Sequence, residues 1–232
     1  MEKTGKQSVI VIIPTLNEEE NLVDLFTELN QMGYHNVLIV DANSRDRTVE
    51  IAKELGADVI LQNGRGKGAA LRQAFESNGL NGDRIVIMDA DGSMSPKEIP
   101  RLVEALDSGA DVVKGSRFLP FGYSEDLNTI RRMGNLLFLL LVNFFWSTKY
   151  TDLCYGFGVF RRDAIKKLCQ HLKSINFEIE TEICIKAKKL GLKVKEIPSM
   201  ELRRNHGKSN LSIFRDGALI LKTIVKELGK RT

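Results

Sequence analysis

Residues 85–96 read IVIMDADGSMSP, an apolar run that ends abruptly in two carboxylates one residue apart. A buried strand that delivers Asp89 and Asp91 to a sheet edge puts bare negative charge in a costly place, so such a pair usually holds a cation. Hard carboxylate oxygens suit Mg²⁺ or Mn²⁺, with substrate phosphates completing the coordination. The alternative is a helix N-cap, because Asp91 and two serines precede Pro96. This stretch alone leaves both interpretations open.

Upstream of this stretch, short β-branched runs alternate with amphipathic patterns. Strands are predicted at residues 8–13, 36–40, 58–61 and 85–88, and helices at 17–32, 46–55 and 69–78. Pro14 is expected to end the first strand. Strand and helix alternate with short connections, which favours a parallel sheet covered by helices on both faces. The predicted fold class is therefore α/β, with a Rossmann-like, mostly parallel sheet.

The second half of the chain is less regular. Its predicted elements are a helix at 96–108, a strand at 111–114, alternating strand and helix from 158 to 198, and an amphipathic helix at 212–228. No linker rich in Pro, Gly or Ser divides the chain, so we expect one domain over residues 1–232.

The segment 130–146, IRRMGNLLFLLLVNFFW, is almost wholly apolar after its two arginines. It is too short to span a bilayer. As a core helix it would bury every face. As an interfacial helix it would sink its Leu, Phe and Trp side chains among acyl chains, while Arg131 and Arg132 meet lipid headgroups. The sequence favours neither reading.

Composition narrows the class of protein. The formal net charge of +4 is too small to indicate a partner nucleic acid, but it is compatible with phosphate-bearing substrates or an anionic membrane surface. The three cysteines match no metal-ligand or CxxC spacing, which indicates a reducing compartment. Residues 1–8 are polar and do not resemble a signal peptide. We expect a cytoplasmic protein, peripheral on the cytosolic face of a membrane if 130–146 is interfacial.

In parallel sheets, ligands bind beyond the carboxyl ends of the strands. Three polar clusters fall there, at residues 14–18, 41–48 and 89–93. Asp41 suits hydrogen bonds from a nucleobase or ribose, or alternatively a turn that caps the next helix. The glycine-rich segment 64–68 suits backbone N–H groups and Lys67 that approach an anion, or alternatively a flexible turn.

A basic loop, RRNHGKSN, occupies residues 203–210. Arg203, Arg204 and Lys208 suit a clamp on a diphosphate, because arginine offers forked donors and lysine a point charge. The alternative is a solvated run of charge before the last helix.

Seven motifs follow one another along the chain: IIPTLNEEENL (12–22), VDANSRDRT (40–48), GKGAAL (66–71), DADGSMSP (89–96), GSRF (115–118), TDLCYGF (151–157) and NHGKSNL (205–211). Together they resemble the nucleotide-sugar glycosyltransferases of family 2, which have the GT-A fold. Within that family the chain looks most like the dolichyl- and polyprenyl-phosphate sugar synthases, of which dolichyl-phosphate mannose synthase is typical.

The resemblance implies a role for each candidate residue. Asp89 would lie near the ribose or sugar and Asp91 on the metal ion, Mg²⁺ or Mn²⁺, with both acids as ligands. Arg117, the third catalytic candidate, would face the acceptor phosphate or the donor sugar. The nucleoside pocket would be lined by Pro14, Thr15, Asn17, Glu18 and Asp41. Arg203, Arg204 and Lys208 would lie on a loop that closes over the donor diphosphate.

The resemblance also implies that residues 1–115 bind the nucleotide sugar and residues 116–232 the acceptor. Two departures leave the sugar open. Many relatives carry two consecutive acids after the second strand, where this chain has Ala42 as the second residue. Mannose synthases often carry Gln at the position of Ser93.

The predicted function is metal-dependent, inverting transfer of a hexose from a UDP- or GDP-sugar to polyprenyl (dolichyl) phosphate at the cytosolic membrane face. A lipid phosphate is already ionised near pH 7, so it needs positive charge, which Arg117, Arg131 and Arg132 could supply. The first alternative is a soluble or protein-bound hydroxyl acceptor, and the second is a non-catalytic nucleotide-sugar-binding module.

A hydroxyl acceptor would need a general base to remove its proton. Glu178, Glu180 and Glu182, in the sequence NFEIETEI, are the candidates for that base. Their alternative role is the polar face of a helix.

Overall fold

The computed structural model describes residues 9–77, 80–207 and 210–229. The strands are β1 (Val9–Thr15), β2 (Val37–Asp41), β3 (Asp58–Leu61), β4 (Arg84–Ile87), β5 (Val112–Ser116), β6 (Tyr123–Ser124), β7 (Gly158–Arg161), β8 (Val194–Pro198) and β9 (Met200–Glu201). The helices are α1 (Glu19–Gln31), α2 (Thr48–Glu54), α3 (Lys67–Glu76), η2 (Pro96–Glu98), α4 (Ile99–Asp107), α5 (Thr129–Trp146), α6 (Arg162–Cys169), α7 (Ile179–Lys189) and α8 (Ile213–Leu228). Residue 78, where the helix predicted from residue 69 was expected to end, lies outside the described residues.

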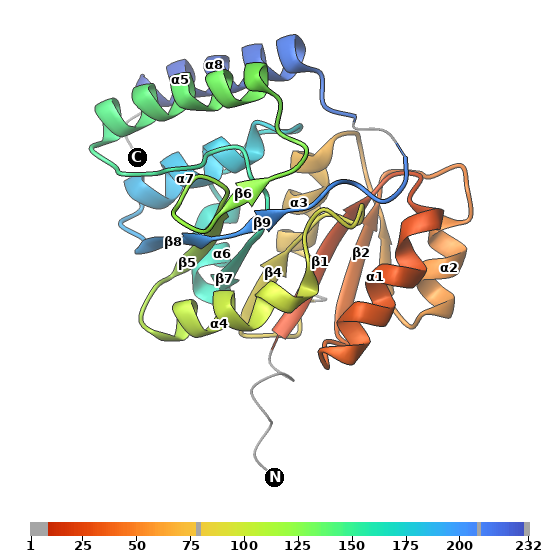
Figure 1. Ribbon diagram of the computed structural model, residues 1–232. Coiled ribbons are helices and arrows are strands. Elements are labelled where there is room, and N and C mark those ends of the chain that lie inside the picture. The colour runs from red at the N-terminus through yellow and green to blue at the C-terminus, as the bar shows by residue number, and fades with distance from the viewer. Residues whose placement is uncertain (1–8, 78–79, 208–209, 230–232) are drawn as a thin grey trace.

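The central sheet has seven strands in the order β3-β2-β1-β4-β7-β5-β8. Strand β7 runs antiparallel to both of its neighbours, and the other neighbouring pairs are parallel. Helices cover both faces of the sheet (Figure 1). The predicted α/β fold with a mostly parallel sheet is therefore confirmed.

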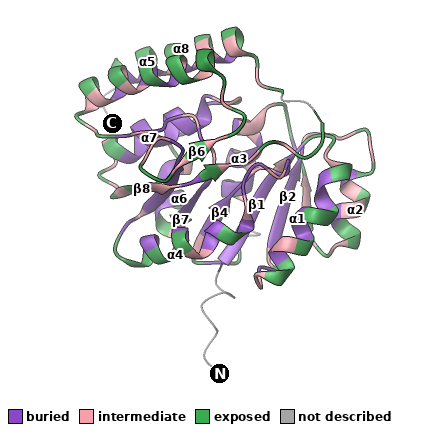
Figure 2. Ribbon diagram, in the orientation of Figure 1, coloured by how far each residue is buried: buried purple, intermediate pink, exposed green. Residues whose placement is uncertain are grey.

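Alternate residues of a strand point to opposite faces of the sheet, and β1 divides its side chains accordingly. Val9, Val11 and Ile13 pack in one core with apolar residues of α1 and α4. Ile10 and Ile12 pack in a second core with residues of α3, α6 and α7. Strands β1, β2, β4, β5 and β7 are largely buried, and exposed residues lie on the outer sides of the helices (Figure 2).

Two predicted boundaries were wrong at the end of β1. The strand continues through Pro14, which is in register with Val40 of β2. Pairing with β4 stops at Ile12, so the N–H that Pro14 lacks is not needed by a ladder on that side. Helix α1 begins at Glu19 rather than at Asn17, because Asn17 has φ +55°. Asparagine tolerates this left-handed conformation better than most residues.

Helix α5 is the predicted apolar segment, and α8 lies beside it at one end of the molecule (Figure 1). A third core joins Phe138 and Val142 of α5 to Ile185 of α7 and to Ile220 of α8. The other sides of α5 carry exposed apolar residues, so the helix is not buried on every face. Over the described ranges, no helix has both the length and the apolarity needed to cross a bilayer.

A buried charge cluster fixes α8 to α7. The carboxylate of Glu227 lies 2.8 Å from Lys186 Nζ and 3.0 Å from Lys189 Nζ, and all three side chains are buried. Burial by itself raises the pKa of Glu227, but the two lysines outweigh it and lower that pKa below its ordinary value of 4.5.

Replacing Glu227 with alanine leaves two ammonium groups without their carboxylate. We expect Glu227→Ala to lower the free energy of unfolding by about 3 kcal/mol or more, measured by urea denaturation near pH 7. Exposed Glu104 on α4 provides the control, and Glu104→Ala is expected to change little. Because the pKa of Glu227 is lowered on folding, its stabilisation is full above pH 4.5 and is lost as the pH falls through the lower folded-state value. Equal effects of the two variants would contradict this role.

Candidate active site

The loops after β1, β2 and β4 meet at the carboxyl edge of the sheet, where they border a cavity of about 360 Å³. Pro14 and Thr15 line it from the end of β1, Glu18 from the loop that follows, and Asp89 and Asp91 from the loop after β4. The cavity continues to α5 and α8, where its walls include Ile130, Phe138 and Ile220. A polar region and an apolar region thus share one space.

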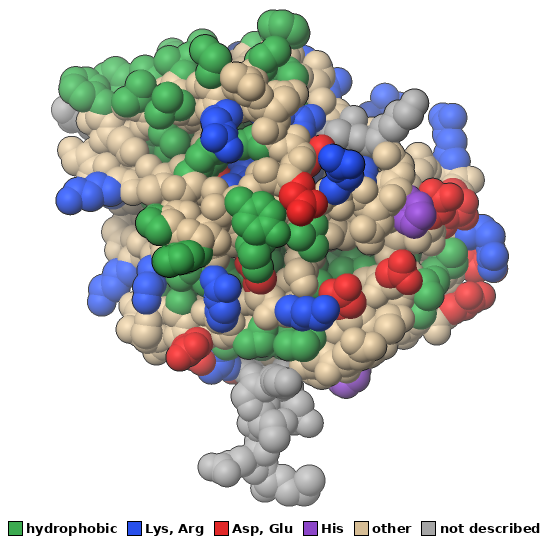
Figure 3. Space-filling model, viewed as in Figure 1, with side chains coloured by type: hydrophobic (Ala, Val, Ile, Leu, Met, Phe, Trp, Pro, Cys, Tyr) green, Lys and Arg blue, Asp and Glu red, His purple; other side chains and the backbone are tan. Residues whose placement is uncertain are grey.

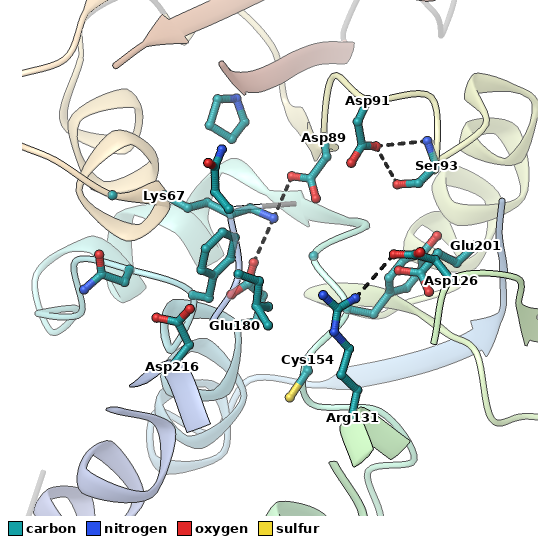
Figure 4. A pocket seen from close by; sticks show the side chains of 18 of the residues that line it. Lys67, Asp89, Asp91, Ser93, Asp126, Arg131, Cys154, Glu180, Glu201 and Asp216 are labelled. Carbon is teal, nitrogen blue, oxygen red and sulfur yellow. Dashed lines mark hydrogen bonds and ion pairs between the residues drawn. The ribbon is translucent and has the colours of Figure 1, made fainter. Parts of the chain in front are cut away.

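Asp89 belongs to a chain of three charged groups. Lys67 Nζ lies 2.6 Å from Asp89 Oδ1 and 2.9 Å from Glu180 Oε1, so the lysine bridges the two acids (Figure 4). Burial by itself lowers the pKa of Lys67, but the two carboxylates more than compensate and raise it, so the amine is protonated near pH 7. Lys67 therefore contacts the acidic pair directly, at the start of α3.

The glycine-rich segment before α3 packs tightly against the loop before α7. Gly66 has φ +94°, and a Cβ there would lie 2.2 Å from the carbonyl oxygen of Ile175. The backbone N–H of Ala69 donates to the same oxygen. This packing fixes the end of the segment next to α3 and with it the position of Lys67, whereas Gly64 has no atom within 4 Å of a Cβ built there.

Asp91 is held from two sides. Its Oδ1 accepts hydrogen bonds from the backbone N–H of Ser93 at 3.0 Å and from Ser93 Oγ at 2.6 Å. Its Oδ2 lies 2.6 Å from Arg204 Nη2, and the same guanidinium lies 3.4 Å from Glu18 Oε1. Burial raises the pKa of Glu18, and its hydrogen bond with Asn21 and the charge of Arg204 partly offset that rise. Ser95, not Asp91, caps the helix that follows.

The donor atoms of this site fit a hard divalent cation. Asp89 and Asp91 offer carboxylate oxygens, which Mg²⁺ and Mn²⁺ prefer. Within the described parts of the chain, no three His, Cys, Asp or Glu side chains are grouped to hold a metal ion unaided. Two protein ligands with substrate phosphates in the remaining positions is the arrangement usual for Mg²⁺. Lys67 and Arg204 meanwhile supply positive charge to the same two acids.

Arg117 lines the cavity but is firmly held by acids. Its Nε and Nη2 lie 2.7 Å and 2.9 Å from the fully buried carboxylate of Asp152, and its Nη1 lies 3.2 Å from Glu201. Burial by itself lowers the pKa of Arg117, but Asp152 and Glu201 more than restore it. Arg131 also lines the cavity and pairs with Asp126 at 3.3 Å. Arg132 lies instead over the ring of Phe118.

Several candidates from the sequence do not line the cavity. Asp41 is fully buried and accepts hydrogen bonds from Thr15 Oγ1 and from the N–H and Oγ of Ser44. Asn17 binds the backbone N–H of Arg45. Both residues therefore organise the loops beside the cavity.

The residues of the basic loop, 203–210, also differ in whether they line the cavity. Arg204 reaches Asp91, whereas Arg203 is exposed and does not line the cavity. Lys208 lies outside the described residues. The binding roles assigned to this loop stay predictions.

Sequence reasoning missed the acids that hold Arg117. Asp152 lies in the motif TDLCYGF, to which no role was assigned. Cys154 of the same motif lines the cavity, where burial and the charge of Asp152 raise its pKa to about 12. Its thiol is therefore neutral near pH 7 and is not a nucleophile. The signal available for Asp152 was that it is the one charged residue of this motif.

One of the two roles predicted for Glu178, Glu180 and Glu182, the polar face of a helix, was wrong. All three are buried, so they do not form a solvated polar face of α7. Glu182 Oε2 accepts hydrogen bonds from the backbone N–H groups of Lys173 and Ser174. Glu178 Oε1 accepts two from the backbone just before α7. Of the three, Glu180 lines the cavity.

A mostly parallel sheet with an Asp-x-Asp pair at its carboxyl edge, beside a cavity lined by arginines that acids hold in place, is the arrangement expected from the resemblance to GT-A glycosyltransferases. The model of the family "Glycosyl transferase family 2" matches residues 10–169, which is more than half of the chain. The protein therefore belongs to glycosyltransferase family 2 and is an enzyme of that class.

Individual relatives agree with this assignment. "Glycosyltransferase AglJ" of Haloferax volcanii is 31% identical over 214 residues, covering 92% of this chain and 69% of the relative. "Polyprenol monophosphomannose synthase" of Mycolicibacterium smegmatis is 31% identical over 216 residues, covering 89% and 82%. These relatives confirm the resemblance to polyprenyl-phosphate sugar synthases.

A solved structure has the same fold. Glucosyl-3-phosphoglycerate synthase from Mycobacterium tuberculosis, in complex with Mn²⁺, UDP-glucose and phosphoglyceric acid, superposes with a TM-score of 0.76. The match covers 96% of this chain and 80% of the other, at 20% sequence identity. At that identity, the likeness concerns the fold alone.

Proposed function

We propose that this glycosyltransferase moves a hexose from a UDP- or GDP-sugar to a polyprenyl phosphate, with inversion, at the cytosolic face of a membrane. The observation that carries the proposal is the composition of one cavity. It is lined by the acidic pair, by Arg117 and Arg131, and by apolar residues of α5 and α8. The acidic pair suits a metal ion bound to the donor diphosphate, the arginines suit an anionic acceptor, and the apolar residues suit the lipid attached to that acceptor.

On the donor side, we propose that residues 1–115 bind the nucleotide sugar. Mg²⁺ or Mn²⁺, held by Asp89 and Asp91, would neutralise the charge that develops on the diphosphate leaving group. The relative with the same fold, solved with Mn²⁺ and UDP-glucose, supports a divalent ion at such a site. Arg204 lines the same cavity and contacts Asp91. In that position its guanidinium can bind phosphate oxygens through two parallel hydrogen bonds.

On the acceptor side, an ionised phosphate needs cations and no general base. Arg117 and Arg131 both line the cavity, and arginine is the side chain best suited to bind a phosphate through two parallel hydrogen bonds. Their positions are fixed by Asp152 and Asp126, so little side-chain entropy is lost when an anion binds. The named activity of the mycobacterial relative, polyprenol monophosphomannose synthase, supports a polyprenyl phosphate as the acceptor.

The transfer reaction tests this function directly. Labelled UDP-glucose, UDP-N-acetylglucosamine and GDP-mannose are each incubated with polyprenyl phosphate and Mn²⁺ or Mg²⁺. The proposal expects label from one donor to enter butanol-extractable lipid phosphate. Label confined to a water-soluble product would favour a hydroxyl acceptor. Donor binding with neither transfer nor hydrolysis would favour a binding module.

The membrane contact that we propose uses the outer surface of α5 and α8. Exposed apolar side chains gather there, as Figure 3 shows at the end of the molecule where these helices lie. They include Ile130, Met133, Leu136, Leu137, Leu140, Phe144, Phe214, Leu221 and Val225. An apolar surface on paired helices beside the acceptor cavity suits a helix pair embedded in the lipid interface.

Charge on this surface should weaken the contact. Leu140 and Phe144 are 63% and 79% exposed, so Leu140→Lys with Phe144→Lys does not disturb the core. We expect the double variant to bind vesicles of phosphatidylcholine and phosphatidylglycerol at least about tenfold more weakly, because two apolar side chains are lost from the interface. Vesicle co-sedimentation measures this. Affinity for the donor should not change, and undiminished vesicle binding would contradict the proposed surface.

A further inference from the structure

Two carboxylates share the guanidinium of Arg117. Its Nε and Nη2 donate to Asp152 at 2.7 Å and 2.9 Å, and its Nη1 donates to both carboxylate oxygens of Glu201 at 3.2 Å. All three nitrogens are therefore bound by acids. Because two negative groups face one positive group, these three side chains together have an excess of negative charge, which opposes the binding of a further anion.

One of the two acids is fixed in place. The side chain of Asp152 is fully buried, and its carboxylate also accepts hydrogen bonds from the backbone N–H groups of Arg117 and Cys154. The guanidinium carbon of Arg117 in turn lies 4.9 Å from the centre of the buried ring of Tyr155, a cation–π contact. Since neither Arg117 nor Asp152 can move without opening the core, an anion that binds Arg117 would have to replace the contact with Glu201.

Glu201 is held less firmly than Asp152. Its side chain is 15% exposed and lines the cavity, on the same side as Asp126 and Arg131 (Figure 4). The hydroxyl of Ser124 donates to Glu201 Oε2, so the carboxylate keeps a partner when it leaves Arg117. The backbone of Glu201 is paired independently of its side chain, because β9 pairs with β6. The side chain can therefore turn away from Arg117 while the strand stays in place.

A carboxylate and a phosphate bind a guanidinium through the same N–H donors. Nη1 of Arg117, to which Glu201 presents both its oxygens, is thus a donor that an acceptor phosphate would use. We propose that the Glu201 carboxylate occupies the place of the acceptor phosphate on Arg117 and is displaced when polyprenyl phosphate binds. The proposal rests on the proposed function and adds to it a residue that determines acceptor specificity.

The displacement of Glu201 selects for a phosphate that is attached to a lipid. Any anion that binds Arg117 has to overcome the contact with Glu201. Inorganic phosphate gains only the polar contacts in return, whereas polyprenyl phosphate also buries apolar surface against residues of α5 and α8 such as Ile130, Phe138 and Ile220. Glu201 therefore keeps free phosphate from blocking the acceptor site.

Steady-state kinetics of label transfer test this role. The donor is the one of UDP-glucose, UDP-N-acetylglucosamine and GDP-mannose that wild type uses, the acceptor is polyprenyl phosphate in detergent, and inorganic phosphate is the competing anion. Glu201→Gln keeps the length of the side chain and an oxygen for Ser124 and Arg117, but loses the negative charge. We expect the KM for polyprenyl phosphate and the Ki of inorganic phosphate each to fall at least about tenfold. The KM for the donor should stay within a factor of about two.

Glu125→Gln is the matched control. Glu125 is an exposed acid next to β6 that accepts a hydrogen bond from the backbone N–H of Arg203 and does not line the cavity. The same charge is lost there, and neither the acceptor KM nor the phosphate Ki should change. If Glu201→Gln melts at a lower temperature than wild type, Glu201→Met, which is also uncharged and of similar length, repeats the comparison.

The inference and the proposed function fail in different ways. An unchanged or higher value of either constant in the Glu201 variants, or an equal effect of Glu125→Gln, overturns the inference. The proposed function then still stands, since wild type transfers label to the lipid phosphate. Failure of wild type to transfer label from any of the three donors to polyprenyl phosphate overturns both.

Discussion

Asp91→Asn is expected to lower the rate of hexose transfer by about 10³-fold. The amide keeps an oxygen for the N–H and Oγ of Ser93, so the loop after β4 should retain its conformation. What the variant loses is the negative charge that would hold a divalent cation against the leaving diphosphate. Initial rates of label transfer to polyprenyl phosphate, at saturating donor and Mn²⁺, measure the loss.

The control for this variant is Asp107→Asn on α4, which removes a carboxylate that pairs with Arg84 at 3.0 Å. Its transfer rate should equal that of wild type within a factor of about two, since exposed ion pairs contribute little. Thermal melting of both variants checks that the fold is intact. If Asp91→Asn retained more than about a tenth of the wild-type rate, the acidic pair would not have the role assigned to it here.

Arg204→Ala is expected to act in opposite directions on metal binding and on transfer. Arg204 Nη2 lies 2.6 Å from Asp91 Oδ2, so its guanidinium would compete with a cation for that carboxylate. Removing a positive charge at this distance should strengthen Mn²⁺ binding without nucleotide by about tenfold. Transfer should nevertheless fall by about 10²-fold, because the variant loses the cation that we propose to bind the leaving diphosphate.

Two measurements test Arg204→Ala separately. Electron paramagnetic resonance counts free Mn²⁺ during a titration of the protein alone, and the label assay gives the transfer rate. The control is Arg101→Ala, an exposed arginine of α4 that binds the carbonyl oxygen of Pro198, and neither quantity should change. Unchanged or weaker Mn²⁺ binding by Arg204→Ala would show that the ion pair with Asp91 does not compete with the metal.

The centre of the sheet was predictable because its parallel strands are buried on both faces and therefore appear as short apolar runs. β1, β2 and β4 are such runs, and the helices between them are amphipathic. The place of β7 was not predictable in the same way. It runs antiparallel between β4 and β5, and local periodicity contains no information about which distant strand is its neighbour.

The acidic pair was found from sequence because both acids lie together at the end of one strand. The groups that bind them were less visible, since they come from distant parts of the chain. Lys67 arrives from α3, and Arg204 from the loop after β9. Glu180 was the hardest to interpret, because the sequence EIETEI suits an exposed helix face as well as a buried one. Its buried carboxylate is paired with Lys67, which comes from another helix.

The most direct measurement of the central claim is a calorimetric titration of the wild-type protein with its nucleotide-sugar donor, once with Mn²⁺ and once with EDTA. Because Asp89 and Asp91 would bind the diphosphate through a shared divalent ion, the account predicts tight binding with Mn²⁺ and at least about a hundredfold weaker binding with EDTA. Equal affinity under the two conditions would contradict it.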